Sequence, residues 1–358
     1  MRVLYHITHR DNMYASRLQA EGYRDAFRDM GHTFEFVSIR DNFSTKLRIF
    51  GPDLLVTSIH LLPWIYRHRG VREIRDERRR GMVVGCFCPP WTVPGKSLHS
   101  LKNRPDVLRL ARQGSFPDFF YSYFTERTME EVVHRTGVPY LYVPDAANRL
   151  RHFPAPPSAG KKCDAVFVVN FLRHKRATFR EYLDPLRERF DVRVIGHDWT
   201  WWHRRVGMLQ STSQALGLRI FDSLRKLGPE PAELRAWYAS ATVCLNFHST
   251  SQRKIGEAIN SRTFHIAACG GCQVCDDVAD IRSHFDDSEI VVARDRKDFV
   301  EALTYFKAHP EAAQSLGHRA SVKALAHHTF HHRAKSFIGM VDQVRARRHE
   351  DTSLIPSI

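Results

Sequence analysis

The sequence has no apolar segment long enough to cross a membrane. A spanning helix needs roughly 20 consecutive apolar residues, and the nearest candidate, residues 54–66, is interrupted by His60 and Pro63. The opening residues, MRVLYHITHRDN, include an apolar run that is too short for a signal peptide and is typical of a β-strand. We therefore expect a cytoplasmic protein without integral membrane association.

Cysteine is scarce, and its pattern does not indicate disulfide bonds. There are seven cysteines, an odd number, and most lie in apolar, strand-like segments, which favours reduced thiols. Cys269, Cys272 and Cys275 have a spacing found in metal sites, but no fourth ligand follows at a regular interval. Alternation in the strand-like segment CQVCD would also point neighbouring side chains to different faces. We therefore expect no metal site here.

Acidic residues are too few to balance the basic ones. The chain has 54 Lys and Arg against 39 Asp and Glu, a formal net charge of +15. The excess is spread over both halves of the chain and is not confined to a tail. Such a balance favours an anionic ligand, an acidic acceptor or a negatively charged surface as the binding partner.

Apolar and helical segments alternate along the first 150 residues. Helical patterns, such as those at residues 13–30 and 126–135, separate six short apolar segments: RVLYHIT, HTFEFVSI, DLLVTSI, MVVGCF, DFFYSYF and PYLYVP. Strands that alternate with helices of this length are typical of βαβ units with a parallel sheet. Because the strands are apolar throughout, we expect helices to cover both faces of the sheet.

A segment rich in proline, glycine and alanine, FPAPPSAGKK at residues 153–162, predicts a linker. The alternation then restarts with the apolar segments DAVFVVN, DVRVIG, LRIFD, TVCLNFH, CQVCD and SEIVVA. We therefore predict an N-terminal domain over residues 1–152, a C-terminal domain over 163–335, and a C-terminal helix with a basic tail over 336–358. The predicted fold class is α/β, with two Rossmann-like, doubly wound parallel sheets facing each other across a ligand-binding cleft.

The segment NSRTFHIAACGG, residues 260–271, has the pattern of a short buried helix with a polar start. Asn260 or Ser261 suits the N-cap, which places Arg262 and Thr263 in the first turn. A cation at this end opposes the helix dipole unless an anion lies beside it. The cap, the free amides and the guanidinium together predict a diphosphate site. The alternative is that Arg262 simply extends into solvent.

The second half of the chain resembles a known family. From CLNFH to HHTFHHR it looks like the C-terminal half of spore-maturation-type (CgeB-like) glycosyltransferases, which are GT-B enzymes related to the retaining group 1 glycosyltransferases. The resemblance covers about residues 160–340 well and the first half only in architecture. Its most specific parts are Asn260-x-Arg262-Thr263-Phe264, the closing HHTFHHR, and Ala268-Cys269-Gly270-Gly271, whose glycines permit a sharp turn.

The resemblance implies an enzyme that moves a sugar from a nucleotide-diphosphate sugar, with UDP as the expected nucleotide, to an acceptor in the interdomain cleft. It also suggests retention of the anomeric configuration. The acceptor would be a glycan, a protein or another acidic molecule. The sequence has no Asp-x-Asp triplet, which metal-dependent glycosyltransferases of the other major fold use to chelate the diphosphate. We therefore expect a metal-independent site without a cofactor, in which Arg, Lys and a helix N-terminus neutralise the donor.

In such enzymes the start of this helix binds the diphosphate and the sugar, and a carboxylate after the phenylalanine holds the ribose. This chain has His265 at that position, with Glu257 eight residues before it. A histidine can hydrogen-bond a ribose hydroxyl or a phosphate, although a core histidine satisfied by the backbone is the alternative. The expected donor-binding residues are Glu257, Asn260, Arg262, Thr263, His265, Gly270, Gly271 and Lys175.

Further candidate residues follow the first strand of each domain. Arg173 and Lys175 come after DAVFVVN, and the resemblance suggests that they face the diphosphate, where positive charge would stabilise the leaving nucleotide. A solvated helix start is the alternative for these basic residues. His9 and Asp11 follow RVLYHIT, and an imidazole held by a carboxylate suits a general base. The expected catalytic residues are His9, Asp11, Arg173 and Arg262.

Two other functions stay open. The positive charge supports a DNA-modifying glycosyltransferase that acts on hypermodified bases, although no interleaved aromatic and basic motif accompanies it. The departures at His265 and at Cys88, a position near which relatives carry an acid, favour a non-catalytic nucleotide-binding relative instead.

Two segments have no assigned role in these expectations. The arginine-rich segment at residues 67–80 predicts a solvated helix face, although it could guide a polyanionic acceptor or contact an anionic membrane surface. Trp199, Trp201 and Trp202 could stack on a base or a sugar, although packing between domains is the commoner role of such a cluster.

Overall fold

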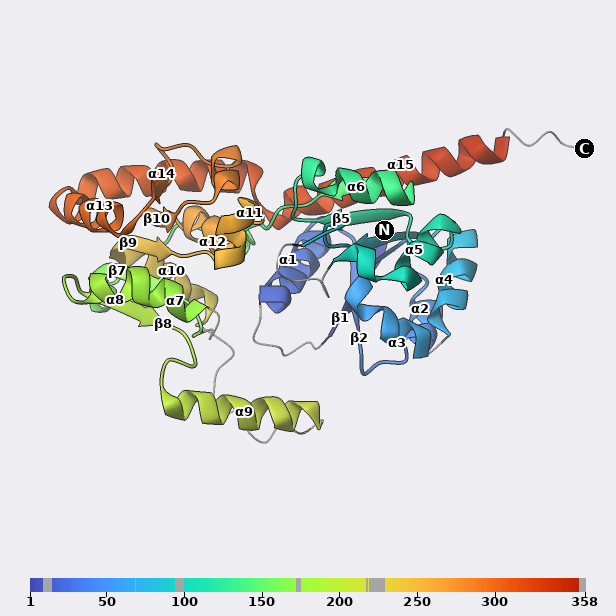
Figure 1. Cartoon of the computed structure of the whole chain (residues 1–358), viewed down its shortest axis with the longest axis horizontal. Coiled ribbons are helices and arrows are strands. Elements are labelled where there is room, and N and C mark those ends of the chain that lie inside the picture. Colours follow the sequence, from blue (N-terminus) through green and yellow to red (C-terminus); the bar gives the residue numbers. More distant parts are fainter. Residues whose placement is uncertain are drawn as a thin grey trace, which may run out of the picture. The chain divides into compact units, whose positions relative to one another are not determined.

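The computed structural model describes residues 1–8, 15–67, 69–93, 100–171, 175–216, 218 and 229–353. The chain divides into two compact units (Figure 1). The first contains Met1–Asp145 together with the chain from Phe330 onward, and the second contains Ala146–Thr329. None of the described helices is both long and apolar enough to span a bilayer.

The first unit is built on a six-stranded sheet in the order β2-β1-β3-β4-β5-β6. All neighbouring strands are parallel. The six apolar segments predicted from the sequence all form strands: β1 (Arg2–Ile7), β2 (Thr33–Ser38), β3 (Leu54–Ser58), β4 (Val83–Phe87), β5 (Phe119–Ser122) and β6 (Tyr140–Tyr142). The parallel sheet expected for this half of the chain is therefore confirmed.

Helices of the first unit connect these strands and cover the sheet. They are α1 (Ala15–Asp29), α2 (Phe43–Phe50), α3 (Leu62–Arg67), α4 (Gly70–Arg79), α5 (Pro105–Arg112), α6 (Glu126–Thr136), α15 (Phe330–Ser353) and single 3-10 turns at Ile59–Leu61 and Leu101–Asn103. Capping residues set several of their ends. The Asn42 side chain accepts a hydrogen bond from the Thr45 amide at the start of α2, and Gly137 ends α6 in the left-handed region at φ 68°.

The second unit has a five-stranded parallel sheet in the order β11-β10-β9-β7-β8. Its strands are β7 (Cys163–Val168), β8 (Val192–Ile195), β9 (Ala241–Asn246), β10 (Gln273–Asp276) and β11 (Val291–Ala293). Five of the six predicted apolar segments therefore form strands. The sixth, LRIFD, lies outside the described residues apart from Leu218.

The helices of the second unit include the short helix predicted after Asn260. They are α7 (Arg176–Thr178), which continues through a π-helical turn (Phe179–Leu183) into α8 (Asp184–Arg187), then α9 (Trp201–Ala215), α10 (Pro231–Ser240), α11 (Thr250–Ile255), α12 (Ser261–Ala268), α13 (Arg296–Ala308) and α14 (Pro310–His327), with 3-10 turns at Ala159–Lys161 and Ala279–Ser283.

The structure divides the chain differently from the sequence-based boundaries. Residues from Ala146 already belong to the second unit, and the chain returns to the first unit at Phe330, not after residue 335. The final helix, α15, is part of the first unit. Hydrophobic periodicity shows that a helix has an apolar face but not which sheet that face covers, so this return could not be read from the sequence.

Aromatic contacts attach α15 to the first unit. The buried ring of Phe337 lies 4.9 Å from the ring of Tyr121, 5.5 Å from that of Tyr23 and 6.0 Å from that of Phe119, measured between centroids. The neighbouring turn places Phe330 against Gly22 so closely that a Cβ at Gly22 would lie 2.3 Å from the ring. Close packing of this kind makes α15 part of the core of the first unit.

We predict that Phe337→Ala lowers the free energy of unfolding of the first unit by about 3–5 kcal/mol, because it leaves a cavity among three aromatic side chains. Lys335→Ala, at an exposed position of the same helix, is the control and should change stability by no more than about 0.5 kcal/mol. Urea unfolding combined with hydrogen exchange of β5 measures both effects. Equal stability of the two variants would show that α15 does not hold this unit together.

Candidate active site

The start of α12 is fixed to the end of β9 by one buried side chain, Asn246. Its Oδ1 accepts hydrogen bonds from Asn260 Nδ2 at 2.9 Å and from Arg262 Nη1 at 3.0 Å, and its Nδ2 donates to Thr263 Oγ1 at 2.9 Å. Asn260, one of the two N-cap candidates in the sequence, is the N-cap of α12, and its side chain accepts from the Thr263 amide. The three predicted residues Asn260, Arg262 and Thr263 therefore form one hydrogen-bonded group.

Three cations gather beside this group at the carboxyl edge of the sheet. The guanidinium of Arg262 lies 5.1 Å from the ring centroid of Phe167, and among the described residues no carboxylate forms an ion pair with it. Lys175 is 7 % exposed, and its Nζ donates to the Phe247 carbonyl at 3.1 Å. Arg253 places its Nε 3.6 Å from Asp276 Oδ2.

Burial of Lys175 and Arg262 is reflected in their pKa values. Desolvation, together with the positive charges of Arg262 and Arg253, lowers the pKa of Lys175 to about 7, while the charge of Asp276 opposes this shift. Burial likewise lowers the pKa of Arg262. Lowered pKa values mean that the protein interior destabilises these charges, and a bound anion would remove that penalty.

Asp276, at the end of β10, is the acid that balances part of this charge. Its carboxylate accepts hydrogen bonds from the His248 amide at 2.8 and 3.0 Å and from His248 Nδ1 at 2.7 Å. The proton of the imidazole therefore lies on Nδ1, and burial lowers the pKa of His248, which keeps the ring neutral. His248 Nε2 is buried and has no hydrogen-bond partner among the described residues.

Sequence reasoning did not identify Asn246, His248, Arg253 or Asp276 as site residues. The sequence did contain a signal for three of them. The polar residues of NFH (246–248) and CD (275–276) stand at the ends of two apolar segments, and parallel strands bring their carboxyl ends to the same edge of a sheet. The register confirms this arrangement, since Asn246 pairs with Cys275 in the β9–β10 ladder, next to Asp276.

The two predicted donor-binding glycines lie at the other end of α12, about 12 Å of helix from Arg262. Gly270 has φ 77°, and its carbonyl oxygen would lie 2.2 Å from a Cβ at Gly317. A Cβ at Gly271 would lie 2.7 Å from the sulfur of Cys244. Both positions require glycine for a turn and for close packing, so they do not join the cationic group.

His265 is buried in the core and makes no hydrogen bond to the cationic group. It is 6 % exposed, its ring centroid lies 4.0 Å from that of His152, and the Ala146 backbone hydrogen-bonds it. Burial, followed by the charge of Arg262, lowers its pKa to about 3, so the ring is neutral. These contacts fit the core alternative and not ribose binding.

Of the four remaining predicted residues, the structure describes one. Glu257 lies partly buried in the loop between α11 and α12. His9, Asp11 and Arg173 lie outside the described residues.

The three closely spaced cysteines pack separately. Cys269, Cys272 and Cys275 are all buried, and each belongs to a different cluster of core residues. In the described part of the chain, no three His, Cys, Asp or Glu side chains are arranged to hold a metal ion.

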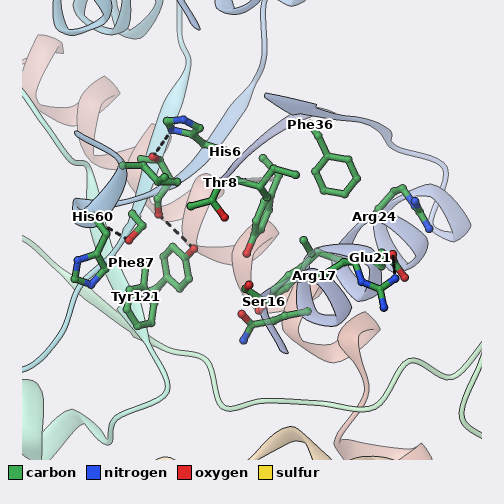
Figure 2. Close-up of a pocket in the computed structure, with 18 of the residues that line it drawn as sticks. His6, Thr8, Ser16, Arg17, Glu21, Arg24, Phe36, His60, Phe87 and Tyr121 are labelled. Atoms are coloured by element: carbon green, nitrogen blue, oxygen red, sulfur yellow. Dashed lines mark hydrogen bonds and ion pairs between the residues drawn. The ribbon is translucent and has the colours of Figure 1, made fainter. Parts of the chain in front are cut away.

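The first unit contains a cavity of about 830 Å³ at the carboxyl edge of its sheet. Phe87 and Tyr121 line one side, and α1 brings Arg17, Glu21 and Arg24 to the other (Figure 2). Arg17 Nη1 donates to Glu21 Oε1 at 3.0 Å. The volume is typical of sites for small molecules, and the aromatic faces suit the ring of a sugar or another flat ligand.

Polar groups at the strand ends give this cavity hydrogen-bonding capacity. His6 Nδ1 and Thr57 Oγ1 share a hydrogen bond of 3.0 Å, and Tyr121 Oη donates to the Thr57 carbonyl at 3.4 Å. Burial lowers the pKa of His6 to about 4, so this ring is neutral at physiological pH. Thr8, the first residue after β1, also lines the cavity.

Residues 173–339 match the sequence profile of the family described as glycosyl transferase-like. No curated protein is a recognisable sequence relative of the chain.

Solved glycosyltransferase structures share the fold over nearly the whole chain. Sucrose-phosphate synthase from Thermosynechococcus elongatus has a TM-score of 0.61 at 13 % identity, with 97 % of this chain and 100 % of that chain covered. The Anabaena protein HepE in complex with UDP-glucose has a TM-score of 0.57 at 10 % identity, with 98 % and 100 % covered. The DNA-modifying enzyme β-glucosyltransferase, solved with and without uridine diphosphoglucose, has a TM-score of 0.55 at 10 % identity, with 96 % and 100 % covered.

Identities this low establish the fold alone, and the family match adds the sequence evidence for residues 173–339. The chain therefore has the GT-B fold of solved glycosyltransferases, and residues 173–339 match the profile of a glycosyl transferase-like family.

Proposed function

We propose that the second unit binds a nucleotide-diphosphate sugar, UDP-linked, and that the protein transfers its sugar to a hydroxyl group of an acceptor held by the first unit. The observation that carries this proposal is the charge at the carboxyl edge of the second sheet. There, Lys175, Arg253 and Arg262 face the buried carboxylate of Asp276, and a second carboxylate, that of the half-exposed Glu181, lies 3.8 Å from Arg253 alone. A diphosphate supplies the missing negative charge.

In this proposal the cations and the start of α12 stabilise the diphosphate as it leaves with the nucleotide. Fixed positive groups in a partly buried site stabilise developing charge more strongly than water does. They take the role that a metal ion has in other glycosyltransferases, so the site needs neither metal nor cofactor. We place Glu257 at the donor sugar and Arg173 beside the diphosphate. Solved neighbours carry UDP or UDP-glucose, which supports the choice of nucleotide.

The acceptor, a glycan, a protein or another acidic molecule, would present its hydroxyl from the cavity of the first unit. The aromatic faces of Phe87 and Tyr121 suit a sugar ring. His9 and Asp11 remain our choice for the groups that activate the hydroxyl, because they follow β1, whose last residues line this cavity. Retention of configuration and a cytoplasmic location are part of the proposal, the first on the family resemblance alone.

A second candidate function is glycosyl transfer to DNA. The net charge of +15 favours it, and one neighbour in fold is a DNA-modifying glucosyltransferase.

The first prediction concerns Arg262→Met, which removes the charge but keeps most of the side-chain volume. We expect the dissociation constant for UDP-glucose to rise by about 10- to 100-fold, because a charged hydrogen bond contributes about 1.5–3 kcal/mol. Because the unpaired cation is costly without a ligand, the melting temperature of the free protein should stay unchanged or rise. Isothermal titration calorimetry and thermal unfolding measure the two effects.

Arg294→Met is the matched control, since Arg294 is an 80 % exposed arginine of the same unit. It should bind UDP-glucose as the wild type does. If both variants bind equally well, Arg262 is not part of the donor site.

The second prediction concerns pH. The pKa of Lys175 is about 7 in the free protein, and a bound diphosphate would raise it, so binding takes up a proton above pH 7. We expect the affinity for UDP-glucose to be constant below about pH 7 and to fall by about tenfold per pH unit above it, until the pKa of the complex is reached.

Calorimetry in two buffers with different ionisation enthalpies measures this proton uptake directly. Lys175→Met should bind more weakly below pH 7 and should take up no proton at any pH. Constant wild-type affinity from about pH 6 to 9 would remove Lys175 from the donor site.

The third prediction separates the two acceptor classes. If the acceptor is a small molecule or a glycan, DNA should bind only through its phosphates, and the affinity should fall steeply between 50 and 200 mM salt, by about 10³-fold for six contacts. No labelled sugar should then pass from UDP-glucose to duplexes with hydroxymethylated bases. Transfer of label to such DNA would favour the second candidate function.

A further inference from the structure

The helix α9 exposes an unusual number of large apolar side chains. Trp201, Trp202, Met208, Leu209 and Leu216 are between 51 % and 71 % exposed. Figure 1 shows α9 set apart from the sheet of its own unit. Folded proteins rarely expose a continuous apolar patch without a binding partner for it.

These side chains lie on one face of the helix. Counting from Trp201, they occupy positions 0, 1, 7, 8 and 15, which fall within about one third of a turn at 100° per residue. The stripe beside it is the buried one, with Val206 at 6 %, Gln210 at 2 % and Ser213 at 5 % exposure. The helix is thus held by a mostly polar face and presents its apolar face outward.

Positive charge accompanies the apolar face. Arg204 and Arg205 are exposed in the first turns of α9. The Arg205 guanidinium lies 3.8 Å from the ring centroid of Trp201, and that of Arg204 lies 5.0 Å from the ring centroid of Phe171. The helix contains no aspartate or glutamate. Tryptophan, long aliphatic side chains and arginine on one exposed face are the composition of helices that lie in the interface of an anionic bilayer.

We propose that α9 is a membrane-docking helix that inserts Trp201, Trp202, Met208 and Leu209 into the surface of an anionic phospholipid bilayer. Arg204 and Arg205 contact the lipid phosphates. The helix lies in the interface and does not cross the bilayer, in agreement with its length of 15 residues. The proposal does not depend on which donor or acceptor the enzyme uses.

Pairing with a second copy of the chain fits the charge less well. A symmetric contact would place the α9 face of one protomer against the same face of its partner. The arginines of both protomers would then enter one interface, without an acidic side chain in the helix to pair with them.

The test is co-sedimentation of the full-length protein with vesicles of equal parts phosphatidylglycerol and phosphatidylcholine. We expect binding to these vesicles, binding at least about tenfold weaker to pure phosphatidylcholine, and loss of affinity with added salt. Trp201→Ser/Trp202→Ser should weaken binding to anionic vesicles by about tenfold or more. Arg204→Glu/Arg205→Glu should weaken binding by a similar factor while leaving the apolar face intact.

Two matched controls report on exposure and charge alone. Ile49→Ser changes a 76 % exposed apolar residue of the first unit, and Arg294→Glu/Lys297→Glu changes two exposed cations, 80 % and 81 % exposed, in the second. Both should bind vesicles like the wild type. Donor binding by every variant should also be unchanged, because none of these residues belongs to the donor site.

Three results would overturn the proposal. The wild type could fail to bind anionic vesicles, or the α9 variants could bind as tightly as the wild type. Alternatively, size-exclusion chromatography with light scattering could show an oligomer that the tryptophan variants abolish, which would assign this face to a second copy of the chain.

Discussion

The second unit is organised around an excess of positive charge at the carboxyl edge of its sheet. Lys175, Arg253 and Arg262 approach one another from three different segments, and the buried Asp276 opposes them together with the half-exposed Glu181 beside Arg253. An arrangement of this kind costs folding free energy, because burial disfavours each unpaired charge. Many other contacts in the surrounding structure hold the cations in place. A bound anion would remove this cost, and the free energy released would add to the affinity for the anion.

The surrounding hydrogen bonds show how this cost is limited. Asn246 holds Arg262 through a neutral oxygen, and the Phe247 carbonyl receives the Lys175 ammonium. Such dipoles orient a cation without neutralising it, whereas a carboxylate would pair with it and compete with a ligand. Asp276 is occupied by the amide and ring of His248. The buried acid is therefore engaged, and the positive charges of Lys175 and Arg262 stay available to a phosphate.

Local patterns in the sequence were sufficient for the strands of both sheets and for the polar start of α12. Apolar runs and an Asn cap are determined by neighbours within a few residues. Asn246 and Asp276 could not be identified in this way, because their importance comes from strand order, which places residues 30 positions apart at one edge. The glycine pair was misassigned for the opposite reason: glycine signals close approach, but the sequence does not say whether a ligand or α14 approaches.

The tryptophan cluster shows that a difference of a few residues in position decides whether a side chain is packed or exposed. Trp199 packs against Phe171 and Phe179, while Trp201 and Trp202, only a few residues on, face outward. The same division applies to the basic residues of this unit. Buried cations such as Lys175 interact with a ligand at short range in a low dielectric, where salt screens weakly, whereas the exposed arginines of α9 act across water within a Debye length of about 8 Å. Ionic strength should therefore change surface docking far more than donor binding, so the two roles of the positive charge can be separated in one protein by salt alone.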